Sequence, residues 1–118
     1  MKNTVSEKIA SSIAFPNPPE IARQNIEKSG AWVARVYGSK FKKLTAEKGI
    51  GRFLLYIRKY PGCTKNELFE KIFKGGPTGG QHIEAFTTMK NAKLIENHKP
   101  GYFITNLGIA MINHFDLN

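Results

Sequence analysis

The stretch LIENHKPGYFITNLG, residues 94–108, decides the fold that the sequence predicts. It holds two short apolar runs, residues 94–95 and 102–104, on either side of a polar turn containing Lys99-Pro100-Gly101. β-Branched and aromatic side chains suit a pleated strand and a Pro-Gly pair suits a turn, so we expect a strand, a turn and a second strand. From Asn106 onward the apolar residues recur at helical spacing, which predicts a helix directly after the hairpin.

Upstream of the hairpin, apolar residues three and four positions apart predict a series of helices. The expected helices cover about residues 4–14, 17–30, 31–44, 46–60, 64–73 and 80–92. Residues 31–44 also fit an edge strand, but we favour a helix because the spacing continues past Gly38 to Phe41. Thr64 and Glu67 have the spacing of a capping box, in which each side chain accepts a hydrogen bond from the other residue's amide.

The expected helix over residues 80–92 follows a glycine-rich turn, GGPTGG at residues 75–80. Its buried stripe is expected to consist of Ile83, Phe86 and Met89. The outer face would then carry mostly short polar side chains, which can approach and hydrogen-bond the edge of a base. These outward residues are Gln81, Glu84, Ala85, Thr88 and Asn91.

Composition and charge narrow the classes of partner. The chain has 118 residues with 41% hydrophobic, enough for one domain or one domain with an arm. Lys and Arg number 18 against 9 acidic residues, and a net charge of +9 favours a polyanionic partner. No apolar run approaches the roughly 20 residues of a membrane span, and the N-terminus is a poor secretion signal. We therefore expect no membrane partner and a cytoplasmic location.

The order of expected elements over residues 46–116 is helix, helix, turn, helix, strand, basic turn, strand and helix. This order resembles the winged helix-turn-helix superfamily of bacterial and phage transcription regulators, including the MarR-like and PadR-like groups. The segments that carry the resemblance are residues 64–68, Ile83, Phe86, Met89, residues 94–95 and residues 102–108. The resemblance implies a mainly α (α+β) fold, with a winged helix-turn-helix domain at 46–118 and a helical extension at 1–45.

The resemblance also implies how duplex DNA would be bound. Residues 80–92 would enter the major groove, where Gln81 can pair with adenine, Glu84 can accept from cytosine, and Ala85 or Thr88 can touch a thymine methyl. Amides of the glycine-rich turn would bind a phosphate at the start of the helix. That turn contributes Thr78 and Gly80 to the expected DNA-binding site.

The tip of the wing would lie along the DNA backbone or in the minor groove. It carries Asn97, His98 and Lys99. Further expected phosphate contacts are Lys65, Lys90, Arg52, Arg58 and Lys59.

The expected function is sequence-specific DNA binding as a transcription regulator such as a repressor. Members of this size usually act as homodimers on pseudo-palindromes. The apolar stripes of residues 5–14 and 20–44 can pack on the domain or form the dimer interface, and we favour the dimer interface. Two alternatives remain open. The fold can serve as a protein–protein adaptor, or as an RNA-binding module, in a replication or phage complex.

We expect no enzymatic activity, no cofactor and no metal site. The three histidines lie far apart in the expected fold, and no catalytic triad or carboxylate pair is evident. Cys63, the only cysteine, precedes a predicted helix start, a position that can lower the pKa of a thiol. We interpret it as a packing residue in preference to a redox switch.

Overall fold

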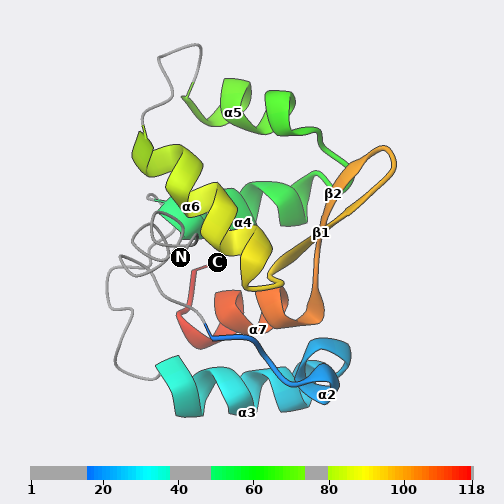
Figure 1. Ribbon diagram of the computed structural model, residues 1–118, viewed down its shortest axis with the longest axis vertical. Coiled ribbons are helices and arrows are strands. Elements are labelled where there is room, and N and C mark those ends of the chain that lie inside the picture. The colour runs from blue at the N-terminus through cyan, green and yellow to red at the C-terminus, as the bar shows by residue number, and fades with distance from the viewer. Residues whose placement is uncertain (1–15, 38–48, 74–79, 118) are drawn as a thin grey trace, which may run out of the picture.

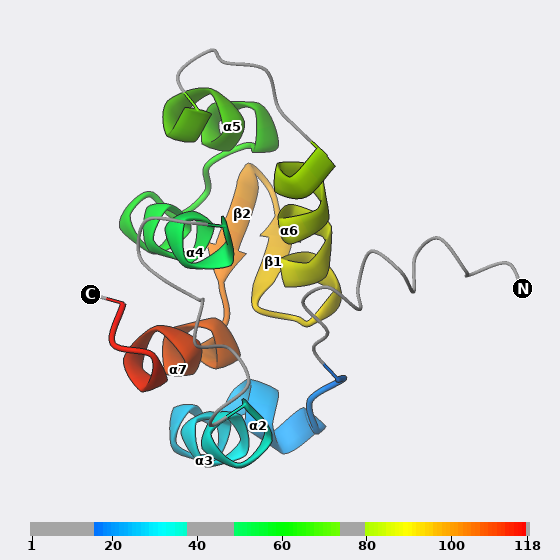
Figure 2. The ribbon, with the colours of Figure 1, turned by 90° about the vertical axis from the view of Figure 1, so that its left-hand side faces the viewer.

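The computed structural model describes residues 16–37, 49–73 and 80–117, which form a mainly helical α+β structure with a two-stranded antiparallel sheet (Figures 1 and 2). The fold class expected from the sequence is confirmed at this level. The expected helix over residues 4–14, residues 38–44, the Thr45 cap and the turn at residues 74–79 lie outside the described residues. The elements are α2 (Glu20–Gln24), α3 (Ile26–Tyr37), α4 (Gly49–Lys59), α5 (Lys65–Phe73), α6 (Gly80–Asn91), β1 (Ile95–His98), β2 (Gly101–Ile104) and α7 (Asn106–His114).

The hairpin forms where the sequence predicts it. Strands β1 and β2 pair in register from Ile95 opposite Ile104 to His98 opposite Gly101, so the turn is only two residues long. The turn before α5 joins the hairpin through a single antiparallel bridge between Cys63 and Tyr102. A Cβ at Gly101 would collide with the Cys63 carbonyl oxygen, so only glycine allows this close backbone approach.

Helices α4 and α5 also follow the prediction. The buried side chains of α4 are the four of the expected stripe: Ile50, Phe53, Leu54 and Ile57. The capping box at the start of α5 is present. The Thr64 amide donates to Glu67 Oε1 at 2.9 Å, and the Glu67 amide donates to Thr64 Oγ1 at 3.1 Å. These bonds satisfy two helix-end amides, so the α5 start is fixed relative to the hairpin bridge one residue away.

An aromatic cluster fixes α6 against the rest of the fold. The Phe86 ring lies 5.5 Å from Phe69 of α5, 6.0 Å from Phe53 of α4 and 5.3 Å from Tyr102 of β2, measured between centroids. All three pairs have the edge-to-face geometry that aromatic rings prefer. One side chain of α6 therefore contacts three other elements, and this packing sets which face of α6 points outward.

Helices α2 and α3 form a layer beneath α7 (Figures 1 and 2). Residues 31–37 are helical as expected, but Gly30 does not end a helix, because α3 runs through it from Ile26 to Tyr37. Burial of Trp32 and Val33 outweighs the roughly 1 kcal/mol that glycine costs in a helix interior.

The apolar stripe of α2 and α3 belongs to the molecule's own core. Ala22, Trp32, Val33 and Tyr37 are buried in one cluster with the apolar residues of α4 to α7. The buried residues of this stripe pack on the protein's own core and not on a second copy, whereas Ile21 and Ile26 remain exposed. Among the described residues, no helix combines the length and the apolar character needed to cross a membrane.

Candidate nucleic-acid interface

The outward face of α6 differs from the expected one. Ala85 and Thr88 are each 3% exposed, so the prediction that they point away from the core and touch thymine methyl groups is wrong. Ile83, expected in the core, is 48% exposed. The cause is the packing of Phe86 against three other aromatic rings. This packing sets the rotation of α6 about its axis, so that the small residues of the helix face the core. The small buried residues let α6 pack closely against the core, and they are Ala85, Thr88 and Ala92. The longer side chain of Ile83 is left on the exposed face.

The surface of α6 that the structure leaves open carries a different set of residues. Ile83, Lys90 and Asn91 are exposed and Thr87 is half-buried, at the three- and four-residue spacing of one helix face. Asn91 was expected on this face and Thr87 was not. Gly80, Gln81 and Glu84 lie in the first half of α6, but their side chains, and Thr78, lie outside the described residues.

Two of the predicted phosphate-binding lysines meet at one ring. Lys65, the first residue of α5, holds its ammonium 5.5 Å from the centroid of Phe86. Lys90, in the last turn of α6, holds its ammonium 6.0 Å from the same centroid. Both lysines are exposed to solvent. Positive charge from successive helices is thus gathered beside the open face of α6, where a cation–π contact steadies each side chain.

The wing is short and partly supported by the body of the protein. The three residues expected to contact DNA from the wing are exposed, as that contact requires: Asn97, His98 and Lys99. His98 Nε2 lies 2.9 Å from Glu96 Oε1, which orients the imidazole along the hairpin. A Cβ built on Gly62 would lie 3.4 Å from Pro100 Cγ, so the turn of the hairpin rests beside the loop that precedes α5.

The cations of α4 are occupied by contacts within the protein. Arg52 Nη2 donates to the Ile72 carbonyl oxygen at 2.7 Å, which ties α4 to the end of α5. The Lys59 ammonium lies 5.5 Å from the Tyr60 ring centroid. Arg58 is exposed and also makes contacts within the fold. Arg52 is therefore a weaker candidate for phosphate binding than Lys65 and Lys90, because its guanidinium is hydrogen-bonded within the fold.

Cys63 is a packing residue. Its side chain is buried, and burial, with a smaller contribution from the Glu67 carboxylate, raises the pKa of the thiol. The idea that its place before a helix lowers this pKa is wrong, because desolvation dominates.

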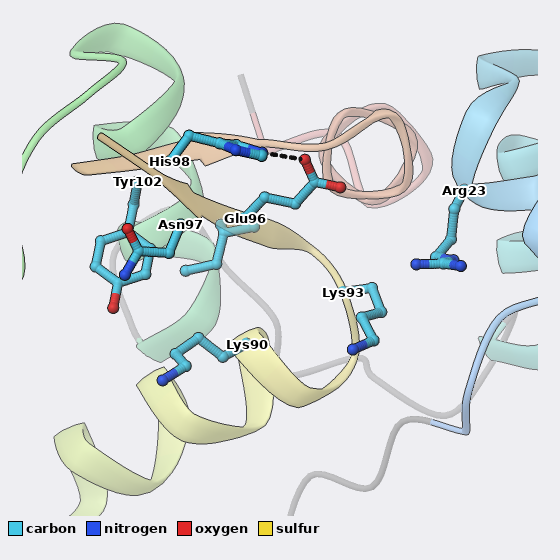
Figure 3. A pocket seen from close by; sticks show the side chains of 8 residues that line it. Arg23, Lys90, Lys93, Glu96, Asn97, His98 and Tyr102 are labelled. Atoms are coloured by element: carbon cyan, nitrogen blue, oxygen red, sulfur yellow. Dashed lines mark hydrogen bonds and ion pairs between the residues drawn. The ribbon is translucent and has the colours of Figure 1, made fainter. Parts of the chain in front are cut away.

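A recess of about 360 Å³ opens between the end of α6, strand β1 and helix α2 (Figure 3). Lys90 and Lys93 line it from the end of α6, Glu96 and His98 line it from β1, and Arg23 reaches it from α2. Lys93 and Arg23 were not among the predicted site residues. Lys93 could have been found from the sequence, because it follows Lys90 by three residues and so lies on the same side of the helix end. Nothing in the sequence indicates that Arg23, about 70 positions earlier, lies beside them.

Comparison of the chain with family models, with curated proteins and with solved structures found no match. Among the described residues, no three side chains of His, Cys, Asp or Glu lie close enough together to hold a metal ion.

Proposed function

We propose that this chain is a winged helix-turn-helix protein that binds duplex DNA as a transcription regulator, with α5 and α6 as the helix-turn-helix pair. The observation that carries the proposal is the meeting of Lys65 and Lys90 at Phe86, beside the open face of α6. Support also comes from the order of α4 to β2 and from the bridge between Cys63 and Tyr102, which joins the turn before α5 to β2. Two lysines that lie together beside a helix in the major groove would neutralise neighbouring phosphates at one edge of that groove.

The open face of α6 suggests which residues read the bases. Asn91 can pair bidentately with adenine, Thr87 can bond either base edge, and Ile83 offers an apolar contact for a thymine methyl. Gln81 and Glu84 remain candidates from the sequence, because both lie in the half of α6 that enters the groove first in this mode of docking. Ala85 and Thr88 are dropped from the proposed contacts because they are buried.

Selection from random duplexes with the purified protein, at about 150 mM salt where nonspecific attraction is weak, tests the proposal. A defined motif is expected. Gln81→Ala should then lose preference at one base position, with about 1–3 kcal/mol less discrimination. Lys99→Ala should instead weaken all duplexes alike and reduce the slope of log K against log salt by about 0.9. Wild-type protein that enriches no duplex, or binds structured RNA better in competition, would overturn the proposal.

One observation favours a second candidate function, a protein–protein adaptor. Ile83 is a large aliphatic side chain exposed on the face that would read DNA, and exposed apolar side chains of this size occur at protein interfaces. Ile83→Ser separates the two functions. A DNA-reading role predicts at most a change at one base position, because a single apolar contact is lost. An adaptor role predicts that the Ile83→Ser variant no longer binds the protein partner of the wild-type chain. It also predicts that neither the wild-type chain nor the variant binds duplex DNA.

We also propose a homodimer that binds two half-sites about one helical turn apart. The buried residues of α2 and α3 pack in the core, so we assign the dimer contact to the other apolar stripe, before residue 16. Deleting residues 1–15 and measuring the mass in solution by light scattering tests this part of the proposal. A dimer that becomes monomeric on deletion supports it, and an unchanged mass contradicts it. The selected motif is expected to be palindromic only in the first case.

A further inference from the structure

The recess beside the wing has a strongly cationic lining. Arg23, Lys90 and Lys93 supply three positive charges, of which that of Arg23 is paired with Glu20, and Glu96 supplies the single carboxylate among the described lining residues. That carboxylate is engaged by His98 at 2.9 Å. The Asn97 side chain adds an amide to the same wall (Figure 3). A site of this size with an excess of cationic donors suits an oxyanion such as a phosphate group.

Lys93 is held at the recess at a cost to the backbone. Its φ is +66°, in the left-handed region, and it occupies the C′ position of a Schellman motif that ends α6. The Leu94 amide donates to the Met89 carbonyl oxygen at 3.1 Å and the Lys93 amide donates to that of Lys90 at 3.0 Å. Glycine is the favoured residue here, because a Cβ is strained at positive φ. A lysine at such a position trades stability for the placement of a cation.

Surrounding bonds fix both Lys93 and Arg23. The Lys93 carbonyl oxygen accepts a hydrogen bond from Thr105 Oγ1 at 2.7 Å, which ties the end of α6 to the start of α7. Asn106 Nδ2 donates to the Gln24 carbonyl oxygen at 2.7 Å, which ties α2 to the same point. Arg23 is ion-paired with Glu20 on its own helix and keeps 32% of its side-chain surface exposed. The backbone positions from which both side chains reach the recess are therefore fixed before any ligand arrives, which reduces the entropy lost on binding.

We propose that this recess binds a backbone phosphate of the DNA duplex, with Lys93 and Arg23 as its donors and Lys90 linking it to the face of α6. This inference rests on the proposed function and extends it, because it makes α2, outside the helix-turn-helix pair, part of the DNA interface. The phosphate is one that α6 and the wing approach together, since the recess lies between these two elements.

The experiment measures binding of the full chain to a fluorescent duplex of about 24 base pairs, enough for two helical turns, over a series of KCl concentrations. The variants are Arg23→Gln and Lys93→Gly. The matched control is Lys28→Gln, which removes one charge from an exposed position on α3, in the same helical layer as Arg23. Far-UV circular dichroism and Tm verify that each variant is folded.

Arg23→Gln and Lys93→Gly are each expected to weaken binding about threefold to tenfold and to lower the salt slope by about 0.9, while Lys28→Gln leaves the slope unchanged. Lys93→Gly should at the same time raise Tm by about 2–4 °C, because glycine relieves the left-handed strain. A purely structural role for Lys93 predicts the rise in Tm without the loss of affinity. Wild-type slopes for Arg23→Gln and Lys93→Gly overturn this inference alone. Absence of duplex binding by the wild-type chain overturns the proposed function as well.

Discussion

Thr88 illustrates how a single residue separates a core position from a contact position. Its side chain is 3% exposed, and within the described part of the structure Oγ1 has no hydrogen-bond partner. A buried hydroxyl without a partner loses its bonds to water and gains none in return. Thr88 was expected on the outer face of α6, in contact with a thymine methyl, yet in the structure it is a small buried residue that lets α6 approach the body.

Thr88→Val is therefore expected to stabilise the protein by about 1 kcal/mol, because valine removes the unsatisfied hydroxyl and nearly keeps the shape. The measurement is the urea midpoint at a constant m-value. Duplex affinity should stay within twofold of the wild-type value. Asn91→Ala, on the open face of α6, is the comparison variant, and it should lower affinity without a change in the midpoint. The reverse pattern would restore Thr88 to the DNA-reading face and reject the observed rotation of α6.

At the scale of elements, helix α5 depends on its first turn. It spans nine residues, Lys65–Phe73, and an isolated helix of this length is unstable in water. The reciprocal hydrogen bonds between Thr64 and Glu67 stabilise the first turn of α5. The packing of Leu68 and Phe69 against the core stabilises the rest of the helix. Because Lys65 is the residue directly after the cap, the cap also sets the position of a proposed phosphate contact.

Thr64→Ala should destabilise the protein by about 1 kcal/mol and lower duplex affinity, because it removes the bond that orients the first turn of α5. Thr64→Ser keeps a hydroxyl at the same position and serves as the control. Thermal unfolding and duplex titration of the two variants make the comparison. Equal Tm values for the alanine and serine variants would show that the cap contributes nothing measurable.

The elements that the sequence predicts well are those with local causes. The capping box, the stripe of α4 and the hairpin each arise from residues a few positions apart, and each is present in the structure. The rotation of α6 is different, because it depends on where Phe86 meets rings from α4, α5 and β2. Periodicity did not resolve it, since Ala85, Thr88 and Ile83 can each be placed on either side of a helix that carries few large apolar residues.

Arg23 shows the same limit for the candidate site. Its place in the recess depends on the bond from Asn106 to the Gln24 carbonyl oxygen, which joins residues 82 positions apart. No local pattern in the sequence predicts such a contact. Lys65, Lys90 and the wing residues, in contrast, lie at positions that local sequence does predict, next to a helix cap, near a helix end and at a turn, and all are exposed.

At the scale of the whole molecule, helix α3 joins the core through Tyr37. This side chain is 1% exposed, and its ring meets Trp32 edge to face at 5.4 Å between centroids. The buried residues of α3 belong to one cluster with those of α4 and α7. Because Tyr37 is part of this core, global unfolding must expose it. The stability of the whole chain is then linked to the titration of this one phenol.

Burial raises the pKa of Tyr37 well above the ordinary value of 10.0, so the folded protein keeps the phenol protonated while the unfolded chain ionises near that value. Above about pH 10 the folded state binds more protons, and the free energy of unfolding must therefore fall as the pH rises. Urea midpoints between pH 8.5 and about 11 measure this fall, and Tyr37→Phe should make it shallower by about 1 kcal/mol per pH unit near the upper end. Tyr60→Phe, at an exposed side chain, controls for the loss of a phenol. Identical pH profiles for wild type and Tyr37→Phe would mean that α3 leaves the core before the rest unfolds.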